Sequence, residues 1–217
     1  MKQKIRRHKN LFIIVGTIFA ISIVLNIAMV IKVHKYKYKV GTESYNYIEK
    51  IKTLNKGSLD IISSAIDIGS IENMEILKLY ENYSDISDNN INLWNEYLYY
   101  QDDKHLITHK KQVNTDESIL NNVDEKIALF FTSILEEEMK TQNYKLVLNG
   151  ELLEEFIEIQ NLCKEIEQYY NDFCEERLNG AVQEEKKDKI ISKYYWIDML
   201  EGINDINKKY VDVEFKL

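Results

Sequence analysis

The chain contains no proline and only seven glycines among its 217 residues. Proline breaks helices and glycine weakens them, so their scarcity allows long helices to continue without interruption. The sequence also lacks a glycine-rich phosphate loop, a nucleophile elbow and a CxxC pair. These absences remove every positive argument for an enzyme, and we expect no catalytic activity and no cofactor.

Cysteine is almost as scarce, with Cys163 and Cys174 as the two examples. They lie eleven residues apart in a segment whose pattern predicts one helix. The rise between them is then about 16 Å, which is too far for a disulfide. We expect Cys163 to be a buried small hydrophobic residue and Cys174 to lie beside the buried face.

An uncharged apolar run extends from Leu11 to Ile31 behind a basic N-terminal tip. As a helix, these 21 residues would be about 32 Å long, which matches the hydrocarbon core of a bilayer. A signal peptide has a shorter apolar region, of about 7 to 15 residues, and a small-residue cleavage site that this run lacks. We therefore predict an uncleaved membrane anchor.

Basic residues flank this run, five before it and four after it. The positive-inside rule then places the N-terminus in the cytoplasm and the bulk of the chain outside, by a margin of one charge. Tyrosines interleave with the lysines that follow, which is typical of a membrane interface. The residues expected at headgroup level are Lys32, Lys35, Tyr36, Lys37, Tyr38 and Lys39.

The charge of the chain changes sign after this segment. Residues 1–40 carry nine basic and no acidic side chains, whereas the remainder carries 19 basic and 36 acidic ones. The basic part suits anionic lipid headgroups, and the acidic part argues against a nucleic-acid partner. Abundant Asn, Ile, Lys and Tyr with little Ala resembles the composition of proteins from bacteria with AT-rich genomes, and it identifies no family.

Apolar residues at alternating spacings of four and three predict helices throughout the acidic part. The clearest helix is predicted from Glu151 to Leu178, and a second seam from Ile119 to Ile134 would form an antiparallel hairpin with it. The segment from Ile190 to Ile206 predicts a third long helix. Further seams run from Ile48 to Ile66 and from Ile76 to Leu98, with breaks expected at Gly57-Ser58 and within Ser84–Asn92.

The predicted fold is therefore all-α, with one N-terminal transmembrane helix followed by an antiparallel bundle of four or five helices. The final residues alternate in polarity like a strand, with Lys145 to Leu148 as a conceivable partner, although a frayed end is the simpler interpretation. The predicted parts are a cytoplasmic basic tail (1–10), the transmembrane helix (11–33), a basic juxtamembrane segment (34–41), the extracytoplasmic bundle (42–210) and a C-terminal tail (211–217).

Two groups of residues are candidates for binding. His105 and His109 would share one face of a helix and could hold a metal ion, but no third ligand is evident, so a solvated connection is the simpler interpretation. Clustered aromatic residues cannot all face one core, so some of them are candidates for a contact surface rather than for an aromatic core. They are Trp94, Tyr97, Tyr99, Tyr100, Tyr194, Tyr195 and Trp196.

Three hypotheses about function follow. The first is a single-pass membrane protein whose helical interaction or scaffold module lies outside the cytoplasm, at the bacterial cell envelope, with the bilayer and either a protein or a second copy as partners. The second is a ligand-sensing bundle that signals through a partner. The third is a metal-binding domain that uses His105 and His109.

Overall fold

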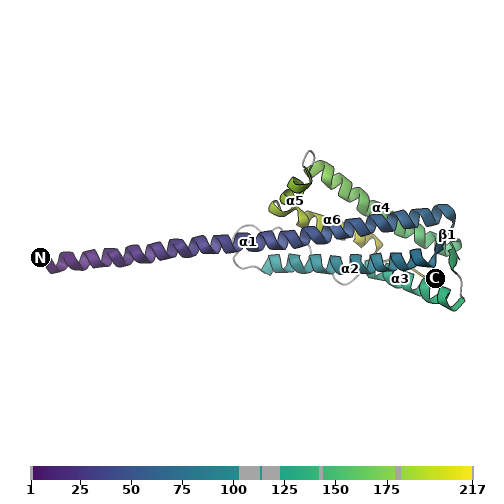
Figure 1. Cartoon of the computed structure of the whole chain (residues 1–217), viewed down its shortest axis with the longest axis horizontal. Helices are drawn as coiled ribbons and strands as arrows, with labels where there is room; N and C mark the ends of the chain where they lie inside the picture. Colours follow the sequence, from purple (N-terminus) through teal and green to yellow (C-terminus); the bar gives the residue numbers. More distant parts are fainter. Residues whose placement is uncertain (1, 103–112, 114–122, 142–143, 179–181, 217) are drawn as a thin grey trace.

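The computed structural model describes residues 2–102, 113, 123–141, 144–178 and 182–216, and these confirm the all-α class and the helical bundle (Figure 1). A short antiparallel pair of strands accompanies the helices. The elements in chain order are α1 (Lys2–Ile68), β1 (Ser70–Glu72), α2 (Asn73–Asp102), α3 (Val123–Thr141), β2 (Lys145–Val147), α4 (Gly150–Leu178), α5 (Gln183–Ser192), α6 (Tyr195–Asn207) and the 3-10 turn η1 (Lys208–Tyr210).

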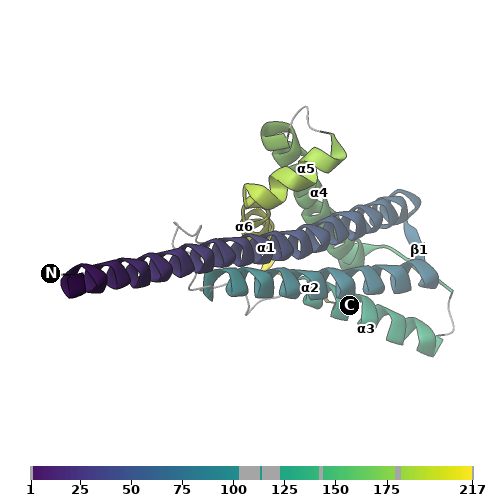
Figure 2. The same cartoon turned by 60° about the vertical axis from the view of Figure 1, so that its left-hand side comes forward.

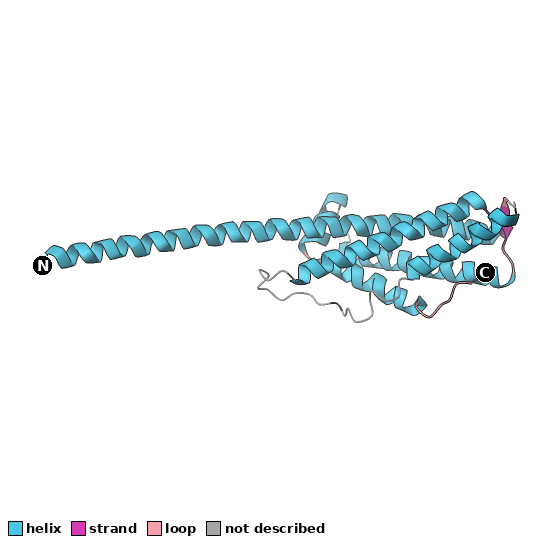
Figure 3. Cartoon of the chain, turned by 90° about the horizontal axis from the view of Figure 1, so that it is seen from below, coloured by secondary structure: helices cyan, strands magenta, loops and turns pink. Residues whose placement is uncertain are grey.

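Helix α1 is one helix of 67 residues, about 100 Å long, and it joins the apolar run to the bundle without a break. Its N-terminal part extends away from all other elements (Figures 1 and 3). Apolar side chains there point outward, and Phe19 and Val30 are 67 % and 68 % exposed. This is a helix long and apolar enough to span a membrane near the N-terminus.

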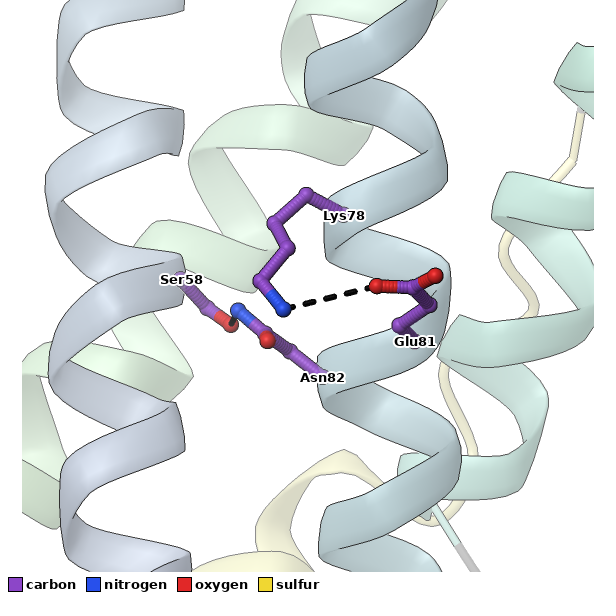
Figure 4. Close-up of polar contacts among 4 residues, drawn as sticks. All are labelled: Ser58, Lys78, Glu81 and Asn82. Atoms are coloured by element: carbon purple, nitrogen blue, oxygen red, sulfur yellow. Dashed lines mark hydrogen bonds and ion pairs between the residues drawn. The ribbon is translucent and has the colours of Figure 1, made fainter.

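The predicted break at Gly57-Ser58 is wrong, because α1 continues through it. Ser58 is fully buried and its hydroxyl accepts a hydrogen bond from the Asn82 amide of α2 at 3.1 Å (Figure 4). Lys78, one turn before Asn82 on α2, forms an exposed ion pair of 3.4 Å with Glu81. The polar residues at this point therefore join two helices instead of ending one.

The predicted break within Ser84–Asn92 is also wrong, since α2 runs unbroken from Asn73 to Asp102. Its apolar face continues through the polar stretch, where Ile86 and Leu93 are buried. The Asn89 amide bonds to the Asp85 carbonyl one turn back at 2.6 Å, which satisfies a polar side chain within the helix. A polar run thus remains helical because its buried positions stay apolar.

Helix α4 confirms the predicted helix and its buried face. Phe156, Cys163 and Tyr170 are each fully buried, and α4 packs along the centrally placed α1. The expected hairpin of α3 with α4 is wrong in its packing, because α3 lies mainly along α2. Between α3 and α4, β2 pairs with β1. The chain thereby passes from α3, which packs on α2, to α4, which packs on α1.

The two strands lie at the end of the bundle farthest from the N-terminus (Figure 3). Ser70 pairs with Val147, and Glu72 pairs with Lys145. The conceivable pairing of Lys145–Leu148 with the C-terminal tail is therefore wrong. The tail contains no strand in its described residues and instead packs Phe215 against Phe130, with ring centroids 6.1 Å apart.

The predicted third long helix is wrong in its continuity, because the chain turns between α5 and α6 (Figure 2). Tyr194 adopts a left-handed conformation with φ 57° at this turn, which a helix cannot pass through. The apolar seam nevertheless stays buried on both sides of the turn, at Ile190 before it and at Ile197 and Leu200 after it.

Candidate functional site

The base of the bundle, where α1 leaves it toward the N-terminus, brings two predicted sets of residues together. The expected headgroup residues lie on α1. Tyr36 is 38 % exposed, Tyr38 is 50 % exposed, and Lys37 is half-buried. Three of the clustered aromatic residues, Tyr100, Tyr194 and Trp196, lie at the same level of α1. The two sets are more than 50 residues apart in sequence, so only the fold connects them.

One face of α1 makes three consecutive contacts with the α5–α6 segment at this base. The Lys37 ammonium lies 5.8 Å from the centroid of the Tyr194 ring, and the Lys187 ammonium lies 5.6 Å from the centroid of the Tyr45 ring. Between them, a Cβ on Gly41 would lie 2.8 Å from the Ile191 side chain, so α5 approaches α1 where α1 has no side chain.

These contacts have a regular spacing on both helices. Positions 37, 41 and 45 of α1 are successive turns of one face, and they meet positions 194, 191 and 187 in reverse order. The α5 helix therefore runs antiparallel to α1. We call this set of contacts the α5 clasp.

The turn after α5 is held by aromatic packing. The Tyr194 ring lies 5.4 Å from Tyr100 at the end of α2, and Trp196 lies edge-on to the same Tyr100 ring at 5.7 Å. A bulky residue with positive φ is strained, at a cost of about 1 to 3 kcal/mol, and persists only where its surroundings fix it. The ring contacts to α2 and the lysine of α1 supply that restraint.

The seven aromatic candidates separate by their burial. Trp94, Tyr97, Tyr100 and Trp196 are buried, so these four fill the core, as in the alternative interpretation. Tyr194 and Tyr195 are half-buried, and Tyr195 packs on Phe173 at 5.7 Å. Only Tyr99, at 62 % exposure, presents most of its surface to the surroundings.

Two carboxylates lie close together where α1 and α2 meet at this base. Burial raises the pKa of Glu96 above its usual value, the charge of Glu43 raises it further, and the charge of Lys39 lowers it. Burial also raises the pKa of the Tyr47 phenol, and the charges of Glu96 and Glu43 raise it further. Lys39 therefore compensates an acidic contact between the helices and also belongs to the basic segment.

A buried polar cluster lies deeper in the bundle, and the sequence analysis did not identify it. Asp124, in the first turn of α3, accepts hydrogen bonds from Asn90 of α2 at 2.7 Å and from Asn207 of α6 at 3.4 Å. Burial raises the pKa of its carboxyl from 3.8 to about 6, and the two amides lower it. The carboxylate thus connects three helices.

Cys163 belongs to the same interior. Its thiol and the Tyr83 hydroxyl are 3.0 Å apart, and its carbonyl accepts a hydrogen bond from Asn55 at 3.0 Å. Burial raises the pKa of this thiol to about 12, so it is protonated and unreactive at neutral pH. The predicted burial of Cys163 is confirmed, and Cys174, eleven residues later on α4, is half-buried.

An open groove of about 510 Å³ lies between α1 and α2. Its lining carries two carboxylates and one ammonium group, so it combines charges of both signs. The lining residues are Glu49, Lys50, Thr53, Leu54, Asp85 and Asn89.

The metal candidates His105 and His109 lie outside the described residues. Within the part of the chain that the structure describes, no three His, Cys, Asp or Glu side chains come together as a metal site. Comparison of the chain with protein-family models, curated proteins and solved structures gave no match. The function must therefore be inferred from the chain's own residues and geometry.

Proposed function

We propose that the chain is a single-pass membrane protein that holds a rigid helical interaction module outside the cytoplasm of a bacterial cell. The observation that carries the proposal is the continuity of α1, whose exposed apolar part and buried core part form one helix. A binding module on such a helix keeps a fixed height and direction above the bilayer. The proposal assigns no catalytic role to the chain.

Charge supports this arrangement. The basic residues of the first 40 positions suit both faces of a bilayer with anionic lipids, and the acidic bundle suits a protein partner better than a nucleic acid. The partner is another protein or a second copy of the chain. Within the span, Asn26 and Gly16 are candidates for contact with a second span.

Topology is the first test. Protease added to intact cells without their wall should digest residues 41–217, because the proposal places the bundle outside. Replacing Arg6 and Arg7 by glutamate should give a mixed population, since one charge decides the orientation. A control with Lys52→Glu and Lys56→Glu, which lie on the surface of the bundle part of α1, should leave the digestion unchanged. Complete protection of the unmodified chain would reverse the proposed orientation.

Proximity labelling from the C-terminus in the native cell then tests the interaction role. A labelling enzyme fused after Leu217 should mark envelope proteins, or the chain itself, and not cytoplasmic proteins. Marking of cytoplasmic proteins alone would contradict the proposal.

The groove between α1 and α2 supports ligand sensing as a second candidate function. Because it carries Glu49, Lys50 and Asp85, it suits a small molecule that bears both charges, such as a free amino acid. Thermal unfolding of the full chain with a panel of amino acids would reveal binding as a rise in midpoint. Asp85→Ala should remove that rise, whereas Asp88→Ala, on the same helix and outside the groove, should keep it. No rise with any amino acid would reject this candidate.

A further inference from the structure

We propose that the turn between α5 and α6 is a second membrane contact, which rests on anionic phospholipid headgroups beside the emerging α1. This inference depends on the proposed membrane anchoring and extends it to residues about 150 positions later in the chain. The surface consists of the exposed Lys193, the half-buried Tyr194 and the basic segment Lys32–Lys39, and we call it the basal surface.

The height of the turn above the membrane follows from helix geometry. Lys37 lies six residues after Ile31, the last residue of the apolar run, which is a rise of about 9 Å. Tyr194 lies beside Lys37, and the backbone of Lys193 is about 3.8 Å from that of Tyr194. Headgroup layers extend about 5 to 7 Å beyond the hydrocarbon, and lysine stems reach further, so the Lys193 ammonium comes within range of the phosphates.

The arrangement of elements agrees with this height. The α5 helix and the C-terminal end of α2 lie at the same level along α1, at the end of the bundle that faces the N-terminus (Figure 1). Tyr99, on that end of α2, is 62 % exposed. An exposed phenol at this height is typical of a membrane interface.

Charge complementarity indicates that the basal surface binds an anionic bilayer. Lys193 adds a fifth lysine to Lys32, Lys35, Lys37 and Lys39, while the remainder of the chain after residue 40 is strongly acidic. The acidic groups near this end of the bundle include Glu43 and Glu96 one turn further into the bundle, Asp188 in α5 and Asp198 in the first turn of α6. The basal surface is therefore the basic face of an acidic domain, and the closest anionic surface is the bilayer that α1 enters.

The turn cannot swing away from this position without breaking contacts. The α5 clasp fixes it to α1, and the Tyr100 ring fixes it to α2. Because α1 is continuous, the whole bundle would sit on the bilayer at one height instead of moving on a flexible stalk.

The test uses the full chain in lipid nanodiscs made of phosphatidylcholine alone or with phosphatidylglycerol. Hydrogen exchange of peptides that cover residues 190–198 should be about fivefold slower in the anionic discs, since one basic residue near such a surface gains about that factor. Lys193→Glu should abolish the difference, and raising the salt concentration should reduce it.

Lys164→Glu is the matched control, because Lys164 is an exposed lysine far from the basal surface. Its neighbour Cys163 accepts a hydrogen bond from Asn55, which lies 18 residues after Lys37 on α1. This variant should keep the slower exchange in anionic discs. Equal exchange in both kinds of disc, or an equal loss in both variants, would overturn the inference and leave membrane anchoring intact. A chain that fails to enter discs of either kind would instead contradict the proposed function. Protection that needs an added envelope protein would assign the surface to a protein partner and overturn the lipid assignment.

Discussion

The two halves of α1 are built from one helix and have opposite surroundings. Before Val33 its described apolar side chains are exposed on all sides, whereas from Val40 onward one face is apolar and is buried by α2, α4, α5 and α6. The backbone conformation is the same in both, so the distribution of apolar residues around the helix decides whether lipid or other helices surround it. An apolar surface on every side suits lipid, and an apolar stripe suits other helices.

The largest expected effect comes from removing a side chain of the bundle core. Phe156 is fully buried and packs edge-on to Phe131 at 5.8 Å, so Phe156→Ala should lower the free energy of unfolding by about 3 to 5 kcal/mol. Denaturant unfolding of the full chain in detergent measures it. Ile157→Ala, one residue later and 38 % exposed, should cost less than about 1 kcal/mol. Equal costs would mean that the register of α4 is wrong.

The same substitution in the first half of α1 sharpens the comparison. Phe19 is 67 % exposed, so Phe19→Ala should leave the stability of the bundle unchanged within about 0.5 kcal/mol. A cost close to that of Phe156→Ala would show that the first half of α1 packs against protein, which contradicts a lipid-facing helix.

A second prediction concerns the pH dependence of stability. The pKa of Asp124 is about 6 in the folded chain and near 3.8 when unfolded, so the folded state binds the proton more tightly. The stabilisation is complete below about pH 4 and is lost as the pH rises through 6, by an amount on the order of 3 kcal/mol. Asp124→Asn should remove this fall relative to the unmodified chain.

The comparison of both chains between pH 4 and pH 7 isolates Asp124 from the other carboxylates. Asp88→Asn, an exposed aspartate of α2, is the control and should keep the pH dependence of the unmodified chain. A parallel pH dependence in the Asp124→Asn chain would mean that Asp124 does not titrate in this range.

The third prediction tests the α5 clasp with two glycines of the same helix. A Cβ on Gly57 would make only an ordinary contact, at 3.8 Å from the Asn82 amide, so Gly57→Ala should stabilise α1 by about 0.5 to 1 kcal/mol through helix propensity. At Gly41 the new Cβ would lie 2.8 Å from the Ile191 side chain, so α5 must move and the gain should be lost. We expect a difference of about 1 to 2 kcal/mol between the two variants, with faster hydrogen exchange in α5 for Gly41→Ala alone.

Several features were predictable because they depend on one segment at a time. The α4 helix was predicted from a spacing that continues over seven apolar positions, and the apolar run from its length and lack of charge. The breaks at Gly57 and in Ser84–Asn92 were wrongly predicted, because a glycine or a polar run does not end a helix whose buried face continues.

Other features depend on contacts that no local pattern contains. The turn at Tyr194 uses a bulky residue with positive φ in place of the glycine that usually signals one, and it is held by Tyr100 and Lys37 from other helices. The basic segment was predictable from composition, but the pairing of Lys37 with Tyr194 was not. The buried Asp124 also lacked a signal, since a lone aspartate in a first helical turn is common on surfaces.

A small loss of stability is expected at Glu165, a residue that the heptad pattern places off the buried face of α4. Glu165 accepts hydrogen bonds from Lys209 at 2.6 Å and from the Tyr210 phenol at 3.0 Å, and Tyr210 itself is buried. Lys209, its largest influence, holds the pKa of Glu165 below its usual value. Because the Lys209 pair is largely exposed and screened, the phenol supplies most of the effect, and Glu165→Ala should cost about 1 kcal/mol. Glu154→Ala, an exposed glutamate of the same helix, should stay within about 0.5 kcal/mol.

The cost of Glu165→Ala should also depend on pH, because a carboxyl with a lowered pKa stabilises the fold only while it is ionised. The cost should therefore shrink as the pH falls below the usual pKa of glutamate. A cost that stays constant down to pH 2 would mean that the two hydrogen bonds do not depend on the charge of Glu165.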